Sequence, residues 1–237
     1  WDLGSRILHH DESIHAVYSW YLLTGRGYVH NPTYHGPLLY DSTALMYFLF
    51  GASDYTARLA PAIFGTLMVG LPYLLRRELG RSGALVSSFL LALSPAILYY
   101  SRSLRHDIYA ATATLALVVA LWRYAGDRQP RWLYLAAAGL VLGFANHELT
   151  FMTMFILVLF LLVMAWRSLL TALWQRDRAA LSPWAEYLLF ISTLAAPQFT
   201  AAVLLLERRL NPTAPWPVVG QLDPLLLFTF SALFSLA

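Results

Sequence analysis

The residues best suited to chemistry lie near the start of the chain, in the run His9-His10-Asp11-Glu12-Ser13-Ile14-His15. This run is predicted to begin an amphipathic helix that ends at about Leu23. His15 follows Glu12 at i+3 and Asp11 at i+4, so the three side chains share a helix face. The pattern favours Asp11, with Glu12 beside it, as a catalytic general base, or a divalent metal ion held by Glu12 and His15. The alternative is ordinary helix-start chemistry, because the helix dipole favours anions in the first turn.

A second candidate site is the run Ser101-Arg102-Ser103-Leu104-Arg105-His106-Asp107. A guanidinium group matches the geometry of phosphate oxygens, so Arg102 and Arg105 are predicted to bind a phosphate. His106 is predicted to contact substrate beside them. Asp107 is predicted to be a further catalytic carboxylate, and it also suits the cap of the helix that follows. The two roles of Asp107 are compatible.

Two shorter polar motifs interrupt apolar sequence, His35-Gly36-Pro37 and Asn146-His147-Glu148. Gly36 permits a tight entry into a helix, and Pro37 suits its first position. His35 is predicted to lie in the wall of a substrate cavity; the alternative is a loop anchored by neighbouring aromatic residues. The second motif must form a polar turn between two spans. Glu148 is predicted to bind substrate in the same cavity.

The composition indicates that these motifs belong to a membrane-embedded chain. Hydrophobic residues make up 59% of the chain and charged residues only 12%, whereas about a quarter of a soluble domain is charged. Most of the surface is therefore predicted to face lipid. The chain has no cysteine, which excludes disulfides and thiolate metal sites. The net charge of +3 comes with scattered arginines, which argues against a nucleic-acid partner.

The apolar segments predict an all-α, multi-pass transmembrane helical bundle. Residues 1–55 are expected to form an outer loop with juxtamembrane helices, and residues 56–237 to form transmembrane helices of the same membrane-embedded domain. Pro37–Phe50 is too short to cross, and suits an interfacial or re-entrant helix. Because both ends look cut, the chain is expected to be a fragment of a longer polypeptide. The predicted spans are Thr56–Leu75, Ala84–Tyr100, Ile108–Trp122, Trp132–Asn146, Phe151–Trp166 and Ala185–Leu206, with a seventh beginning at Leu225.

The short loops predict the orientation of these spans. Arginines gather in three of them: Arg76, Arg77 and Arg81; Arg123, Arg128 and Arg131; and Arg167, Arg176 and Arg178. These loops fall on one side, which the positive-inside rule makes cytoplasmic. Residues 1–55, 101–107 and 146–150 then face outward and carry every histidine of the chain. Ionisable groups close to a membrane mark function, so the active face is predicted to point outward.

The motifs also follow a recognisable order. They run Asp11-Glu12, Asn31-Pro32, His35-Gly36-Pro37-Leu38, Phe50-Gly51, Ala57-Arg58-Leu59, Ser94-Pro95, Tyr100-Ser101-Arg102 and Arg105-His106-Asp107. This series resembles the GT-C superfamily of membrane glycosyltransferases, and within it glycosyltransferase family 39, the protein mannosyltransferase and aminoarabinose transferase type. The likeness covers about residues 1–125 and is greatest to a prokaryotic subgroup. Aminoarabinose transferases place an acidic and a basic residue just before the proline, where this chain has Tyr34, His35 and Gly36. Metal dependence and acceptor class therefore do not transfer.

The resemblance implies a function and a setting. It implies inverting transfer of a sugar from a polyprenyl-phosphate donor to an acceptor, on the outer face of a prokaryotic cytoplasmic membrane, with Asp11 as the catalytic residue. The expected partners are the lipid-linked donor, membrane lipids and other membrane subunits. A divalent metal ion is the one cofactor that the residues suggest. The alternative is a non-enzymatic integral membrane subunit, a scaffold or cofactor-binding part of a larger complex.

Overall fold

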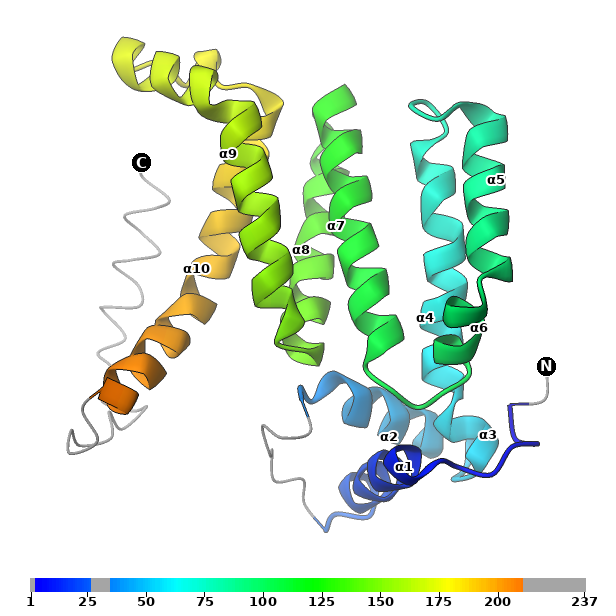
Figure 1. Cartoon of the computed structure of the whole chain (residues 1–237). Helices are drawn as coiled ribbons and strands as arrows, with labels where there is room; N and C mark the ends of the chain where they lie inside the picture. The colour runs from blue at the N-terminus through cyan, green and yellow to red at the C-terminus, as the bar shows by residue number, and fades with distance from the viewer. Residues whose placement is uncertain (1–2, 27–34, 211–237) are drawn as a thin grey trace. The chain divides into compact units, whose positions relative to one another are not determined.

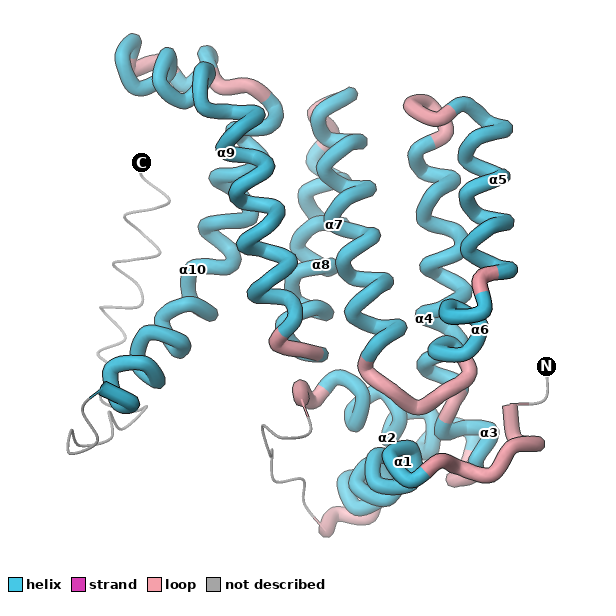
Figure 2. The backbone as a smooth tube through the Cα atoms, in the orientation of Figure 1, coloured by secondary structure: helices cyan, strands magenta, loops and turns pink. Residues whose placement is uncertain are grey.

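The computed structural model describes residues 3–26 and 35–210. This part of the chain contains helices and turns and no strand (Figure 2). The all-α prediction is therefore confirmed. His30, the Asn31-Pro32 motif and the segment from Leu225 onward lie outside the described residues.

The chain divides into two compact units, Trp1–Leu159 and Phe160–Ala237. The second unit contains the end of α9 (Leu149–Gln175), a 3-10 turn η3 (Arg178–Ala180) and α10 (Pro183–Leu210), which covers the predicted span Ala185–Leu206. The first unit contains the start of α9 and all earlier elements. These are α1 (His10–Leu23), α2 (Leu38–Phe50), α3 (Asp54–Ala57), α4 (Leu59–Gly70), a 3-10 turn η2 (Leu71–Leu75), α5 (Gly80–Leu93), α6 (Pro95–Ser101), α7 (Asp107–Asp127) and α8 (Pro130–Asn146).

Three stretches of the described residues are long and apolar enough to cross a membrane: Asp54–Leu75, Asp107–Asp127 and Leu149–Gln175. A fourth crossing is formed if α5 and α6 are counted as one broken span, bent by 63°. α2 is apolar but has only 13 residues, as expected for a helix that does not cross. The described part of the chain is all-helical, and its apolar helices are those of an integral membrane protein.

The predicted span Ala84–Tyr100 is broken at Ser94 and Pro95. α5 ends at Leu93, and α6 begins at Pro95 with Ser94 in an extended conformation (φ −61°, ψ 121°). Proline has no amide hydrogen to donate to the preceding turn, and it pushes the residue before it out of the helical region. The break follows from these two effects, and it gives α6 its own direction.

α7 is the central helix of the first unit and packs against α8 and α4. Small residues allow the close approach: Gly139 of α8 would place a Cβ only 3.2 Å from the carbonyl oxygen of Ala113. Between α7 and α4, the Thr112 hydroxyl donates to the carbonyl of Phe64 at 3.1 Å. Small residues and side-chain hydrogen bonds are the usual means by which helices associate in lipid, where the hydrophobic effect between helices is absent.

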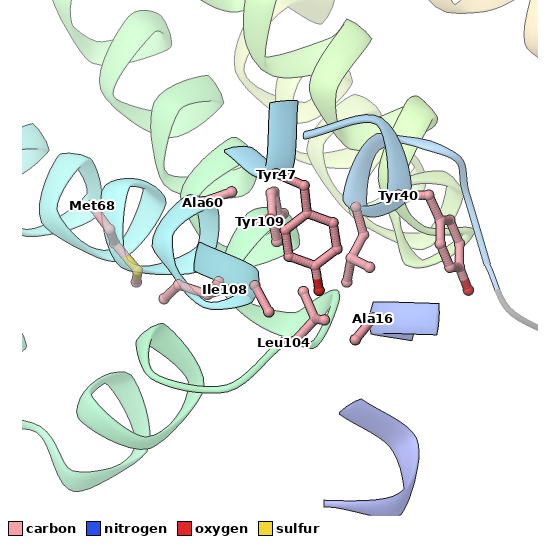
Figure 3. Close-up of a cluster of buried hydrophobic side chains, with 10 residues drawn as sticks. Ala16, Tyr40, Tyr47, Ala60, Met68, Leu104, Ile108 and Tyr109 are labelled. Carbon is pink, nitrogen blue, oxygen red and sulfur yellow. The ribbon is translucent and has the colours of Figure 1, made fainter. Parts of the chain in front are cut away.

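α1 and α2 pack side by side at the end of the first unit where the α6–α7 loop and the α8–α9 turn also lie (Figure 1). A buried cluster fastens them there: Tyr40 and Tyr47 of α2 pack with Ala16 of α1, with Leu104 of the loop and with Tyr109 of α7 (Figure 3). The three segments predicted to share one membrane face therefore do gather at one end of the helices.

Candidate active-site pocket

A pocket of about 230 Å³ lies where these three segments meet. α1, the segment that leads into α2, the loop before α7 and the α8–α9 turn each contribute to its wall. The polar character of the wall sets it apart from the lipid-facing helices around it. Its lining residues are Asp11, Ile14, His15, His35, Arg105, His106, Asp107 and His147.

Arg105 joins two carboxylates at the mouth of the pocket. Its Nη1 lies 3.4 Å from Oδ2 of Asp11, and its Nε lies 3.3 Å from Oδ2 of Asp107. All three side chains are between 39% and 47% exposed, so solvent or a ligand can reach them. The predicted base, the predicted second carboxylate and one of the predicted phosphate ligands are thus brought together.

Glu12 points away from this pocket into the protein. Its side chain is 1% exposed and accepts hydrogen bonds from Arg58 Nε at 3.0 Å, from the Leu104 amide at 2.9 Å and from the His9 amide at 2.9 Å. Burial alone would raise the pKa of Glu12, but these donors and the Arg58 charge outweigh it and lower the pKa to about 2. Glu12 is therefore a buried, ionised anchor, although it neighbours the exposed Asp11.

The predicted metal pair of Glu12 and His15 does not form a ligand group. Glu12 is occupied by Arg58, and Nδ1 of His15 lies 2.9 Å from the Tyr40 hydroxyl. Among the described residues, metal-ligand spacing is found instead at His35, His147 and Glu148.

The two buried histidines of the pocket are neutral. His106 shares two hydrogen bonds with the fully buried Asn146: the His106 Nδ1–Asn146 Oδ1 distance is 3.0 Å, and the Asn146 amide donates to the His106 carbonyl at 2.9 Å. Burial lowers the pKa of His106 to about 3 and that of His15 to about 4. Both rings are thus available at neutral pH as uncharged hydrogen-bonding groups.

His35 is held in the pocket by the residue that follows it. The Gly36 amide donates to the Asn146 carbonyl at 2.9 Å, and a Cβ on Gly36 would collide with the Ala145 carbonyl oxygen. Only glycine allows this approach. His35 itself takes the left-handed conformation, with φ 65°, and its Nδ1 lies 2.9 Å from Oε1 of Glu148.

Arg102 lies in a different cavity from Asp11. It lines a second pocket, of about 280 Å³, together with Arg6, Arg58, Tyr99 and Ser103. The two arginines predicted to hold one phosphate are therefore separated, and Arg105 alone accompanies the carboxylates. Arg58 and Asn146 are two site residues that were not predicted. Each is a polar residue within apolar surroundings, in the motifs Ala57-Arg58-Leu59 and Asn146-His147-Glu148, and this pattern could have identified them.

The fold and the pocket together define a class: a helical integral membrane protein with an acid–base pocket built from the loops at one end of its helices. Residues 34–182, well over half of the chain, match the sequence profile of the dolichyl-phosphate-mannose-protein mannosyltransferase family. The chain belongs to this family and is a membrane glycosyltransferase of the GT-C type. No curated protein and no solved structure matches it. The matched region includes Arg105, Asp107 and Glu148, whereas Asp11 precedes it.

Proposed function

We propose that the protein transfers a sugar from a polyprenyl-phosphate donor to an acceptor hydroxyl, with Asp11 as the general base. The observation that carries the proposal is the shared pocket of Asp11, Arg105 and Asp107. A carboxylate and a guanidinium side by side are the two groups that such a transfer requires. The name of the family, which includes a dolichyl-phosphate sugar, supports the same donor class.

In the proposed reaction, the oxygen of the acceptor hydroxyl attacks the anomeric carbon of the sugar. An oxygen of the Asp11 carboxylate takes the proton from that hydroxyl as the new bond forms. The bond from that carbon to the phosphate oxygen breaks, and polyprenyl phosphate leaves with the electron pair. Attack from the face opposite the phosphate inverts the anomeric configuration. A positioned base of this kind contributes about 10²–10⁴-fold to the rate.

Arg105 is proposed to bind the donor phosphate, because a guanidinium stabilises the negative charge that develops on the leaving group. In the structure this guanidinium contacts both Asp11 and Asp107. Phosphate binding would draw it from Asp11, which would leave the carboxylate free to accept a proton. Asp107, at the first position of α7, would hold Arg105 in place throughout.

His35, His106 and Glu148 are proposed to contact the sugar or the acceptor. His35 and His106 line the pocket, and Glu148 is bonded to His35 at its edge. A neutral imidazole and a carboxylate are ordinary partners for sugar hydroxyls. A purely structural subunit would not need Asp11 in an open pocket, and its exposure supports the enzymatic function over the scaffold alternative.

The pocket is proposed to face outward from a prokaryotic cytoplasmic membrane. The support comes from the opposite end of the first unit, where the η2–α5 and α7–α8 connections carry arginines. Asp127 of that end lies 3.5 Å from Arg77 and 3.6 Å from Arg131, which shows that the two basic loops are neighbours. Positively charged short loops are retained on the cytoplasmic side.

The test is a transfer assay with the full-length protein in proteoliposomes. Radiolabelled polyprenyl-phosphate hexoses and the matching nucleotide sugars are offered separately with membrane extract as the source of acceptor. Asp11→Asn should lower transfer from the lipid-linked donor by about 10²–10⁴-fold. Asp41→Asn, which changes an exposed aspartate of α2 outside the pocket, is the matched control and should remain active.

Two results would contradict the proposal. Asp11→Asn activity within a fewfold of wild type would exclude Asp11 as the base. Transfer by the wild type from nucleotide sugars alone would exclude the donor class.

A further inference from the structure

Three side chains at the edge of the pocket have the chemistry and spacing of a metal site. His35, His147 and Glu148 each offer a ligand atom, and these atoms all lie within 4.8 Å of one another. Two imidazole nitrogens and one carboxylate oxygen are a common ligand set for zinc and similar transition metals. None of the three belongs to the proposed base and phosphate-binding groups.

The separations between the atoms are close to those that a bound ion imposes. His35 Nδ1 lies 2.9 and 3.0 Å from the two Glu148 oxygens, and His147 Nδ1 lies 3.4 Å from Glu148 Oε2. With bonds of about 2.0–2.1 Å, neighbouring ligand atoms of a tetrahedral zinc site are about 3.3 Å apart. Two of the three ligand pairs therefore already have close to the spacing that the ion requires.

One nitrogen of His147 is held by the backbone. The Leu149 amide donates to His147 Nδ1 at 3.1 Å, so this nitrogen carries no proton, and it must release the amide before its lone pair can bind an ion. The His35 and His147 rings stack with their centroids 3.9 Å apart. The stack places the two histidines side by side, and one ring must turn out of it before both can direct a nitrogen lone pair at one ion.

His106 supplies a separate indication of a ligand. It is 4% exposed, and its Nδ1 is bonded to Asn146. Its Nε2 is buried and has no hydrogen-bond partner among the described residues. A buried polar atom without a partner is costly, and this one belongs to a ring that lines the pocket with its centroid 5.1 Å from that of His35. A water on the ion would give it the missing donor.

The backbone around the three ligands is also specialised. His35 has a positive φ, and the following Gly36 is fixed to the end of α8. Strained backbone of this kind is maintained where the surroundings enforce it, and it clusters at ligand sites. The contact brings His35 to His147 and Glu148, which belong to a distant part of the sequence.

We propose that His35, His147 and Glu148 bind one divalent transition-metal ion of the zinc class, with His106 as acceptor for a water on that ion. The ion joins the segment before α2 to the α8–α9 turn across the edge of the pocket. The side chains of His35, His147 and Glu148 are 34%, 16% and 61% exposed, which leaves a path for the ion to enter. Coordination positions remain open for water or a substrate oxygen.

The test measures metal directly and does not depend on sugar transfer. Full-length protein is purified without chelator, incubated with Zn²⁺, passed through a desalting column and analysed by inductively coupled plasma mass spectrometry. The wild type should retain about one zinc per chain, and a chelator should remove it. Glu148→Gln and His147→Gln should each lower the retained zinc at least tenfold.

His10→Gln is the matched control, since His10 is an exposed histidine of α1 that does not line the pocket, and it should retain zinc as the wild type does. Thermal unfolding with added metal gives an independent readout, because an ion that binds only the folded state raises the melting temperature. Zn²⁺ should raise it for the wild type and not for Glu148→Gln.

Three outcomes would overturn the proposal. The first is a wild-type protein that retains no stoichiometric zinc and shows no thermal shift with it. The second is Glu148→Gln and His147→Gln proteins that retain as much zinc as His10→Gln. The third is stabilisation by Mg²⁺ in place of Zn²⁺, which would exclude the zinc class.

Discussion

Glu12 and Arg58 form a buried ion pair, 3.0 Å from Oε1 to Nε, in which both side chains are 1% exposed. The pair connects three parts of the chain. Glu12 belongs to the first turn of α1 and also accepts the Leu104 amide before α7, while Arg58 lies between α3 and α4 and donates to the Leu3 carbonyl at 2.6 Å. Asp11 is the direct neighbour of Glu12, so the pair sets the position of the proposed base against Arg105.

Removing one partner of this pair should be strongly destabilising. Glu12→Gln leaves the Arg58 charge buried without its counter-ion, and Arg58→Met leaves the buried Glu12 carboxylate dependent on the half-exposed Arg6, 3.0 Å away. Each change is expected to lower the free energy of unfolding by about 3–5 kcal/mol. Denaturant titration of the purified protein measures the loss. The double variant Glu12→Gln/Arg58→Met should lose less than the sum of the two, and simple additivity would show that the pair is not coupled.

The Glu12 pair also predicts a pH dependence of stability. The pKa of Glu12 is lowered from 4.5 to about 2 in the folded protein. A carboxyl group with a lowered folded pKa stabilises the protein fully above its unfolded pKa, and the contribution is lost as the pH falls through the folded value. Wild-type stability should therefore fall between about pH 4.5 and pH 2. The melting temperature of Glu12→Gln should be lower than that of the wild type at every pH, and it should change less with pH across this window. Parallel plots of melting temperature against pH for the two proteins would contradict the lowered pKa of Glu12.

The separation of Arg102 from Arg105 predicts unequal effects on donor binding. Arg105→Gln removes the guanidinium beside Asp11. It should raise KM for the lipid-linked donor and lower kcat, so that kcat/KM falls by about tenfold or more. Arg102→Gln changes a residue of the second pocket and should leave the donor KM within about threefold. Steady-state kinetics with a purified donor make the comparison. Equal losses for the two variants would place the phosphate between the pockets.

Gly36 should be intolerant of even one extra carbon. Gly36→Ala puts a methyl group against the Ala145 carbonyl, so the segment must move and His35 moves with it. We expect a loss of stability of about 1–3 kcal/mol and weaker zinc retention. Gly70→Ala is the control, since nothing lies within 4 Å of its Cβ position, and it should be neutral or slightly stabilising. Equal behaviour of the two variants in thermal unfolding would contradict the close approach.

The sequence was sufficient to predict the helical membrane fold and the gathering of residues 1–55, 101–107 and 146–150 at one end of the helices. The gathering follows because successive helices run in opposite directions. Among the described residues, three of the six predicted spans, or four with the broken one, are long and apolar enough to cross a membrane. Asp11, Arg105 and Asp107 were identified because they stand on those loops. The apolar pattern predicted the span Ala84–Tyr100, and Pro95 carried the signal for the break within it.

The sequence could not separate neighbours with similar side chains. Asp11 and Glu12 are both acids in a first helical turn, and what divides them is Arg58, whose burial beside Glu12 depends on packing between α1 and the α3–α4 corner. Arg102 and Arg105 differ in the same way, because the loop that carries them turns one towards each pocket. The ligand group at His35, His147 and Glu148 arises from a long-range backbone contact that no local pattern encodes.

The contact between Gly36 and the end of α8 has an evolutionary consequence. A larger side chain at position 36 is blocked by the Ala145 carbonyl, which is backbone and cannot be changed by substitution at position 145. A larger residue at position 36 therefore requires α8 to end at a different place. Such a shift would also move His147 and Glu148, which follow that end. The segment around Gly36 and the turn after α8 are therefore expected to change together in evolution. A homologue without the glycine should also have a remodelled turn after α8.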